Sequence, residues 1–427
     1  MAMKADLRAC QFPFAFQGRF TERAAAVKKP TLLISALLAL LAPALSAQAA
    51  ESPEADAPAT ASPPQAPALK GCAEIHAADP ADFAAKLCAS MTLDDKIAQM
   101  FMSYPPLAKE GPVNVGAVIM LGPALKNAKT LTAKTSDLQS RAAIPLLVAI
   151  DMEGGQLNRL QFVPELKDAP SGQKLGEMTE ADAEDWGRRL GIQMKKLGLN
   201  CNLGPVLDLA GKGHMFDRER SMGEDPDKVA KAAKAYVLGM KSQGVVAFGK
   251  HFPGYGDTEK NSDQELVVSD RNLEEIRRQA GPFAQVGREM GGVLLTNIAF
   301  TEYGSEPSIL SLGIVSMAHG MVPGWVTMTD DIAVPPLLEA TGGDAAEVVR
   351  RAFRAGNDII LTTAPIDWDK AVDVRGVVKA EVAKDPAALK KRIDQSVLRI
   401  LRLKERMGLL EGLKQAGTPA SKGREKP

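Results

Sequence analysis

The chain has 427 residues, of which 45% are hydrophobic, so it is long and apolar enough to bury one large core. Lys and Arg together number 52, Asp and Glu together also number 52, and the formal net charge is therefore zero. A chain without net positive charge lacks the long-range electrostatic attraction that draws a protein to a polyanion or an anionic lipid surface, which argues against a nucleic-acid-binding protein.

The N-terminal region has the layout of a secretory signal peptide. Lys28 and Lys29 precede an apolar run at 32–45, and a series of small residues follows at 46–50. We predict that residues 1–50 are removed by cleavage near Ala49 or Ala50, which gives a periplasmic or secreted protein. The run is short for a membrane span and no cysteine marks a lipidation site, so an uncleaved anchor is the less favoured alternative and no stable membrane insertion is expected.

Residues 51–70 are rich in Pro, Ala and acidic side chains without an apolar period, which predicts a flexible linker. Cys72 and Cys88 follow close together, and an oxidising compartment would allow them to pair, although free thiols are an equally open alternative. Cys201 lies in an apolar strand pattern, which favours a small buried residue over a reactive thiol.

Short apolar runs of strand length then alternate with amphipathic segments. The eight predicted strands are 97–102, 115–121, 145–150, 197–203, 245–248, 293–298, 325–328 and 358–361. The clearest helical patterns cover 227–242, 273–290, 345–355 and 387–410. Strands that alternate with helices pair in parallel, and eight such units predict an α/β protein with a closed (β/α)₈ TIM barrel.

The pattern predicts one catalytic domain over residues 71–412 and no second domain. The last helix, 387–410, is expected on the outside of the barrel. Residues 413–427 read as a disordered tail because they lack any apolar period.

Catalytic groups of such barrels lie where the strands end, because the carboxyl ends of all eight strands open at one mouth. The polar segments that follow the predicted strands are 151–155, 217–226, 250–256, Asn297 and 329–331. A candidate active site is therefore expected from residues that are far apart in the chain.

Six motifs occur at or near these positions in a fixed order: DMEGG, NLGPVLDL, DRERSMGEDP, GKHFPGYG, PSILS and TMTDD. Together they resemble glycoside hydrolase family 3, in particular its single-domain bacterial β-N-acetylglucosaminidases, over residues 91–410. The resemblance implies a glycan substrate that carries N-acetylhexosamine, and neither a metal nor an organic cofactor. It implies that Asp330 is the catalytic nucleophile and that the sugar is contacted by Asp151, Arg159, Arg220, Lys250 and His251.

The residue types agree with that chemistry. A retaining glycosidase needs an ionised carboxylate on a rigid element below the anomeric carbon, and Asp330 ends a predicted strand. Strand alternation turns Asp331 the opposite way, which predicts a cap for the next helix. Two plainer alternatives stay open: Asp330 is itself an N-cap, and Asp151 with Lys250 forms only an ion pair. His251 is expected to act through hydrogen bonds rather than by titration.

The chain departs from the family pattern after the fifth strand. Where the family has an Asp-Ser-His triplet whose His is the general acid/base, this chain has Asn261-Ser262-Asp263, and Tyr255 stands in place of a second family His. Asp263 is therefore the predicted acid/base carboxylate. The alternative carboxylates on the same loop are Asp257, Glu259 and Glu265. Gln156 also replaces a usual Arg, and His214 has no spacing that separates it from a surface histidine.

The sequence thus predicts an exported β-N-acetylhexosaminidase, acting on peptidoglycan- or chitin-derived glycans by a retaining mechanism with an altered acid/base. The first alternative is a glycan-binding protein on the same barrel that does not cut its ligand, because loss of general acid/base help slows a reaction by about 10²- to 10⁴-fold but leaves binding intact. A phosphorylase or transglycosylase, in which water is not the acceptor, is the second.

Overall fold

A computed structural model describes residues 70–79, 81–104, 111–363 and 373–416. The described residues all belong to one compact unit. The predicted signal peptide, the linker up to residue 69, and residues 417–427 of the predicted tail lie outside the described residues.

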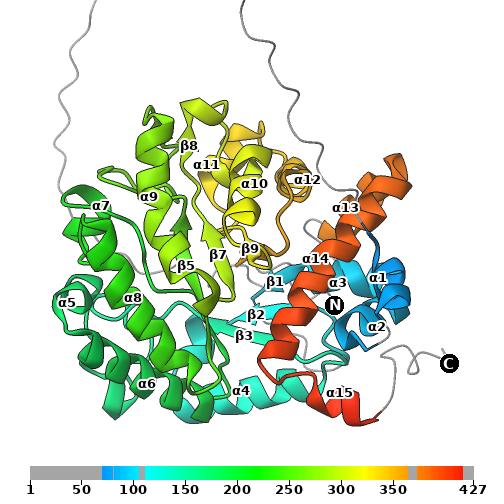
Figure 1. Ribbon diagram of the computed structural model, residues 1–427, viewed down its shortest axis with the longest axis horizontal. Coiled ribbons are helices and arrows are strands. Elements are labelled where there is room, and N and C mark those ends of the chain that lie inside the picture. Colours follow the sequence, from blue (N-terminus) through cyan, green and yellow to red (C-terminus); the bar gives the residue numbers. More distant parts are fainter. Residues whose placement is uncertain (1–69, 80, 105–110, 364–372, 417–427) are drawn as a thin grey trace, which may run out of the picture. The chain divides into compact units, whose positions relative to one another are not determined.

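The eight predicted strands are present, and all of them are parallel (Figure 1). They are β1 (Phe101–Ser103), β2 (Ala117–Ile119), β3 (Leu147–Ile150), β4 (Cys201–Asn202), β5 (Val246–Phe252), β7 (Gly292–Leu295), β9 (Val326–Met328) and β10 (Ile360–Thr362). Their order is β10-β1-β2-β3-β4-β5-β7-β9, and a parallel bridge between Met328 and Ile359 joins the two ends. The (β/α)₈ barrel is confirmed. A separate pair, β6 (Val268–Ser269) and β8 (Ala299–Phe300), lies outside this sheet.

Helices connect the strands and surround them (Figure 1). They are α1 (Cys72–Ala78), α2 (Phe83–Ser90), α3 (Leu93–Gln99), α4 (Ala128–Ser140), α5 (Gly172–Glu177), α6 (Glu180–Lys196), α7 (Gly213–Asp217), α8 (Pro226–Lys241), α9 (Leu273–Val286), α10 (Leu312–Met321), α11 (Pro335–Ala340), α12 (Ala345–Ala355), α13 (Val374–Lys384), α14 (Pro386–Arg406) and α15 (Glu411–Ala416). Side-chain caps start several of them. The Asn272 side chain accepts a hydrogen bond from the third residue of α9, and the Asp225 carboxylate accepts two at the start of α8.

Several boundaries of the sequence prediction are wrong, and local signals explain two of them. The first predicted strand, 97–102, begins in helix α3, because Thr92 caps that helix and two acidic residues favour its first turn, so Ile97 lies on a buried helical face. At the other end, Gly408 adopts a left-handed conformation after α14 and the chain then forms α15 up to Ala416. Residues 413–416 of the predicted tail are therefore helical.

The barrel interior follows the period of two that parallel strands impose. On β2, Ala117 and Ile119 belong to the inner cluster, whereas Val118 between them packs with the surrounding helices. Cys201 points into the same inner cluster and is fully buried, which confirms its predicted structural role. Burial, with a contribution from the charge of Asp151, raises the pKa of its thiol.

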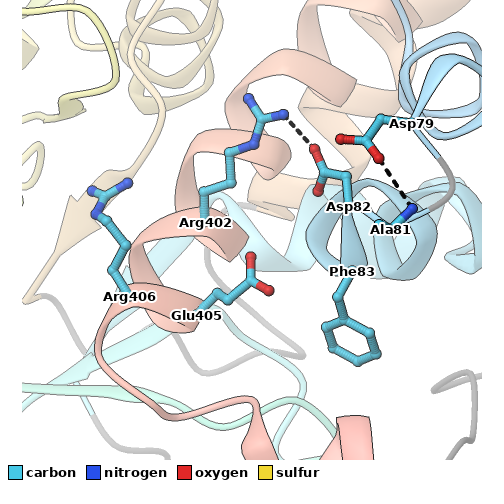
Figure 2. A pocket seen from close by; sticks show the side chains of 7 residues that line it. All are labelled: Asp79, Ala81, Asp82, Phe83, Arg402, Glu405 and Arg406. Atoms are coloured by element: carbon cyan, nitrogen blue, oxygen red, sulfur yellow. Dashed lines mark hydrogen bonds and ion pairs between the residues drawn. The ribbon is translucent and has the colours of Figure 1, made fainter.

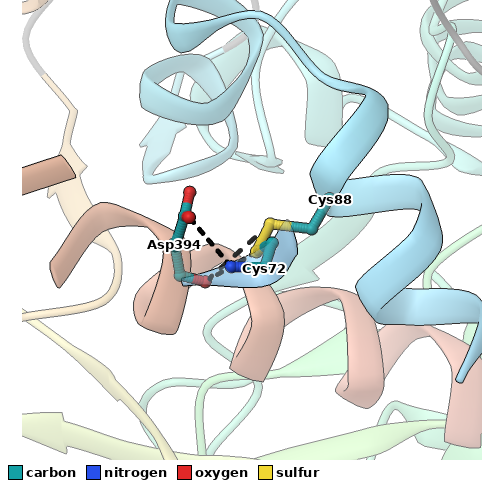
Figure 3. Close-up of side chains that lie close together, drawn as sticks. All are labelled: Cys72, Cys88 and Asp394. Carbon is teal, nitrogen blue, oxygen red and sulfur yellow. Dashed lines mark hydrogen bonds between the residues drawn. A yellow bond between two sulfur atoms is a disulfide. The ribbon is translucent and has the colours of Figure 1, made fainter. Parts of the chain in front are cut away.

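A disulfide joins Cys72 of α1 to Cys88 of α2, with their Cα atoms 5.7 Å apart, so of the two alternatives that the sequence left open the pairing is the one present (Figure 3). Asp394 of α14 lies beside it. The Asp394 carboxylate accepts a hydrogen bond from the backbone N–H of Cys72 at 2.9 Å and forms an ion pair with Lys96 at 2.6 Å. The first helices of the domain are therefore fastened to its long C-terminal helix.

Reducing this disulfide should lower the free energy of unfolding by about 3 kcal/mol, because opening a loop of this length returns chain entropy to the unfolded state. Thermal unfolding with and without a reductant measures the difference. The double variant Cys72→Ala, Cys88→Ala is the control, since the reductant should leave its unfolding temperature unchanged. Equal unfolding of the wild-type protein under both conditions would contradict the prediction.

A surface pocket of about 370 Å³ lies where the turn between α1 and α2 meets α14 (Figure 2). The Arg402 guanidinium points at the carboxylate of Asp82, which also caps α2. None of the polar residues at the strand ends lines this pocket.

Among the described residues, no helix is both long and apolar enough to cross a bilayer.

Candidate active site

The mouth of the barrel holds a network of buried ion pairs built from three strand ends. The Lys250 ammonium, on β5, lies 2.7 Å from a carboxylate oxygen of Asp151 and 2.6 Å from one of Glu153, both of which follow β3. Arg220 donates to both oxygens of Glu153, at 2.7 and 3.0 Å. Glycines at 154 and 155 with positive φ make the sharp turn after these acids possible; a Cβ at Gly154 would lie 1.9 Å from a backbone oxygen.

Glu153 is the centre of this network, because its side chain is 5% exposed and faces two cations. Burial alone would raise its pKa, but the charges of Arg220 and Lys250 outweigh burial and hold the pKa of Glu153 well below its usual range. Burial similarly opposes the charge of Lys250, and the carboxylates of Asp151 and Glu153 overcome it and raise its pKa. Asp151 is the most exposed member, with 24% of its side chain accessible, so it presents a free carboxylate edge to a ligand.

His251 is held in one tautomer by its two neighbours. The Arg220 guanidinium lies 3.3 Å from Nε2, and because arginine only donates hydrogen bonds, Nε2 must accept. The ring proton is then on Nδ1, which donates to the Asp208 carboxylate at 2.7 Å. Asp208 is fully buried and accepts further bonds from the backbone N–H groups of His251 and Tyr255. The imidazole is therefore fixed in orientation, as its predicted hydrogen-bonding role requires.

Asp330 follows β9 by two residues and accepts a hydrogen bond from the backbone N–H of Asp331 at 2.8 Å. Burial, together with the negative charge of Asp263, raises the pKa of its carboxyl from 3.8 to about 7. His251 and the positive charge of Lys250 act in the opposite direction. Asp330 thus lies within electrostatic range of both the ion-pair network and the loop after β5, at a rigid strand end.

Asp331 does not cap the next helix, so that prediction is wrong. Its carboxylate accepts hydrogen bonds from the backbone N–H groups of Ala333 and Thr363, each at 3.0 Å, and contacts the Thr363 hydroxyl. The following helix, α11, has Val334 at its N-cap position and begins with a proline. Asp331 therefore ties the turn after β9 to the end of β10, and Asp330 is not an N-cap either.

The loop after β5 carries Asp263 and is held by Tyr255. The Tyr255 hydroxyl donates to the backbone oxygen of Lys260 at 3.0 Å and accepts from the backbone N–H of Ser262 at 2.6 Å. Asp263 is exposed, and one of its oxygens accepts a hydrogen bond from the side-chain amide of Asn297, at 3.3 Å. The loop thus holds a second carboxylate next to the end of β7.

The other loop carboxylates have different surroundings. Asp257 accepts hydrogen bonds from the backbone N–H groups of Gly211 and Lys212, and Glu265 forms a surface ion pair with Lys260 at 2.7 Å. Glu259 is exposed and has no hydrogen-bond or ion-pair partner among the described residues. Asp263 is therefore the loop carboxylate whose charge most affects Asp330.

Arg159 lies in the turn after β3, and its Nε is buried without a hydrogen-bond partner among the described residues. No hydrogen bond or ion pair joins it to the network in the described part of the chain. His214, on α7, packs its ring against Tyr255 with centroids 5.9 Å apart. The structure therefore brings Asp151, Arg220, Lys250 and His251 into one network, whereas Arg159 stands outside it.

The comparisons with known proteins fit this geometry. The model of the glycosyl hydrolase family 3 N-terminal domain matches residues 92–403, which is most of the described barrel. The chain belongs to glycosyl hydrolase family 3. A β-hexosaminidase of Bordetella avium is 31% identical over 258 residues, which cover 58% of this chain and 73% of that protein.

Solved structures of this family have the same fold. A family 3 β-N-acetylglucosaminidase from Paenibacillus has a TM-score of 0.66 and 26% identity, over 75% of this chain and 63% of that one. A β-N-acetylhexosaminidase from Beutenbergia cavernae has a TM-score of 0.65 and 25% identity, over 74% of this chain and 99% of that one. The chain thus spans less than two thirds of the Paenibacillus protein and nearly all of the Beutenbergia protein.

Two residues of this site were not predicted from the sequence. Glu153 lies in the DMEGG motif, two positions after Asp151. A second carboxylate beside two glycines in that motif was a signal from which its role could have been predicted, and the structure places it against Arg220 and Lys250. Asp208 is the one charged residue in the run from Leu203 to Ala210, all of which is buried. A lone carboxylate in a buried apolar segment requires a partner, and its partner is His251.

Proposed function

We propose that this protein is a β-N-acetylhexosaminidase that acts by a retaining mechanism on peptidoglycan- or chitin-derived fragments, in the periplasm or outside the cell. The observation that carries the proposal is the carboxyl of Asp330 at a strand end, within electrostatic range of Lys250, His251 and Asp263. A family 3 barrel and relatives named β-hexosaminidases and β-N-acetylglucosaminidases support the substrate class.

The sugar would be held by charge-assisted hydrogen bonds, which are the stronger and more directional kind. Asp151 offers an exposed carboxylate edge, while Lys250 and His251 are fixed beside it by buried partners. Arg220 keeps its guanidinium between Glu153 and His251. Arg159, whose buried Nε has no partner among the described residues, supplies a further donor for a sugar oxygen.

The reaction takes two steps. The Asp330 carboxylate attacks the anomeric carbon, the glycosidic C–O bond breaks, and the leaving oxygen takes a proton. Water then attacks the same carbon, a base removes its proton, and the carboxylate of Asp330 is released. We assign Asp263 to the proton-transfer half of the site, because a second carboxylate near the nucleophile is what this mechanism uses. Its charge already raises the pKa of Asp330.

One observation favours a second candidate, a glycan-binding protein that does not cut its ligand. Asp263 is exposed, and one of its oxygens already accepts a hydrogen bond from the side-chain amide of Asn297, so that oxygen is not free to face a glycosidic oxygen. In that case the pocket would bind N-acetylhexosamine and Asp330 would form no bond to it.

A glycosyl fluoride with a second fluorine on the ring, 5-fluoro-N-acetylglucosaminyl fluoride, separates the two candidates. Fluoride leaves with little protonation, and the ring fluorine slows hydrolysis of the glycosyl-enzyme, so the probe should label a nucleophile even where proton delivery is weak. We expect peptide mass mapping to find the sugar on Asp330. Binding of N-acetylglucosamine without any label would favour the binding protein.

A further inference from the structure

We propose that His214 is the general acid/base of this site and works together with Asp263, which lies on a different loop. This inference rests on the proposed hydrolase function and names the group that moves the proton. It assigns a role to a histidine from the loop after β4, whereas the catalytic carboxylates follow β9 and β5.

The first observation is that the two loops are fastened to one another. The Asp257 carboxylate accepts hydrogen bonds from the backbone of Gly211 and Lys212, and the backbone N–H of His214 donates to the oxygen of Thr258 at 2.7 Å. The contact is so close that a Cβ at Gly213 would lie 2.6 Å from that same Thr258 oxygen. Helix α7 is therefore attached to the loop that carries Asp263.

The second observation is the placement of the imidazole. The ring of Tyr255 contacts the rings of both His214 and His251, with centroids 5.9 and 5.7 Å apart. The hydroxyl of the same tyrosine holds the backbone on either side of Asn261 and so fixes the start of the segment that carries Asp263. Tyr255 is therefore a positioning residue that relates His214, His251 and Asp263 to one another.

The third observation is the chemistry available to the ring. His214 is partly exposed, and neither ring nitrogen has a hydrogen-bond partner among the described residues, so both are free to face a ligand. Burial and the positive charges of Arg220 and Arg218 lower its pKa, as does the nearby His251, whereas the negative charge of Asp263 raises it. Arg218 and Arg220 lie in the loop after β4, His251 lies on β5, and Asp263 lies in the loop after β5. The nearby phenol of Tyr255 is neutral, because burial raises its pKa.

The proton balance of the reaction is then complete. In the first step Asp330 bonds to the anomeric carbon, the glycosidic bond breaks, and the His214 imidazolium gives its proton to the leaving oxygen. In the second step the neutral imidazole takes a proton from water as the water oxygen bonds to that carbon, and Asp330 leaves as a carboxylate. Asp263 stabilises the imidazolium through its negative charge.

The test compares His214→Ala with His76→Ala, a matched histidine loss on α1, away from the mouth of the barrel. With a poor leaving group, such as N-acetylglucosamine in chitobiose, we expect His214→Ala to lower kcat/KM by about 10²- to 10⁴-fold. With a dinitrophenyl glycoside, which needs little protonation, kcat/KM should fall less than about tenfold. Azide should raise kcat of the variant on that substrate and yield the β-glycosyl azide. His76→Ala should match the wild-type protein throughout.

Each other outcome has a separate meaning. If His214→Ala and the more conservative His214→Gln match the wild-type protein on both substrates, the inference is overturned. A dependence on the leaving group that appears only in Asp263→Ala would assign the proton to Asp263 alone and keep the proposed function. Failure of the fluoride probe to label Asp330 in the wild-type protein overturns the function itself.

Discussion

Replacing Asp330 with Asn should abolish glycoside hydrolysis while the pocket still binds N-acetylhexosamine. The amide preserves the shape of the carboxyl but cannot form the glycosyl-enzyme, so kcat/KM should fall on the order of 10³-fold or more. Burst kinetics and labelling by the fluoride probe should both be lost, and calorimetric binding of N-acetylglucosamine should remain. Hydrolysis at the wild-type rate would place the nucleophile elsewhere.

The same substitution should stabilise the fold at neutral pH. The folded protein keeps the Asp330 proton up to about pH 7, whereas the unfolded chain releases it near pH 3.8. Between these values the unfolded state binds fewer protons, so the free energy of unfolding of the wild-type protein falls as the pH rises. Asp330→Asn does not titrate and escapes this loss. Its gain in stability should be full above pH 7 and absent below about pH 4.

Asp331→Asn is the matched control for both measurements. The neighbouring side chain ties the turn to Thr363 and does not enter the mechanism, and an amide oxygen can accept the same backbone hydrogen bonds. We expect its activity to stay within a few-fold of wild type and its stability to fall slightly. A loss of activity equal to that of Asp330→Asn would show that the second carboxylate is essential.

Replacing Glu153 with Gln should cost about 3–5 kcal/mol of the free energy of unfolding, because it leaves the buried Arg220 without its carboxylate partner and leaves Lys250 with Asp151 alone. Affinity for the sugar should fall as well, since Arg220 loses its carboxylate partner and Lys250 loses one of its two. Urea unfolding and calorimetric binding measure the two effects.

Glu265→Gln is the control, because that carboxylate pairs with Lys260 on the surface, where 51% of its side chain is exposed. A surface ion pair contributes about 0–1 kcal/mol, so this variant should unfold almost as the wild-type protein does. If the two glutamine variants lose the same stability, the ion-pair network is not the strong element that its burial indicates.

The fold could be predicted from the sequence because the patterns that indicate its strands and helices are local. Each strand is a short apolar run next to an amphipathic helix, and such alternation leaves few arrangements other than a parallel barrel. The errors lie at element ends. Ile97 and Ala98 are apolar and fit a buried face of either a helix or a strand, and the cap at Thr92 favours the helix. The strand β5 extends through Lys250 and His251, where charged residues suggested a loop, because buried carboxylates compensate them.

The sequence by itself determined the barrel and the collection of polar residues at its mouth, since parallel strands bring their carboxyl ends together whatever their distance in the chain. Only the tertiary structure decided the partners. Glu153 meets Arg220 across 67 positions and Asp208 meets His251 across 43, and no local period records such pairs. The burial of Lys404 could not be predicted either, because nothing in the sequence separates it from the exposed lysines of the same amphipathic helix. It is fully buried against Gln99, where desolvation lowers its pKa to about 7, because what surrounds a side chain depends on the packing of the whole chain.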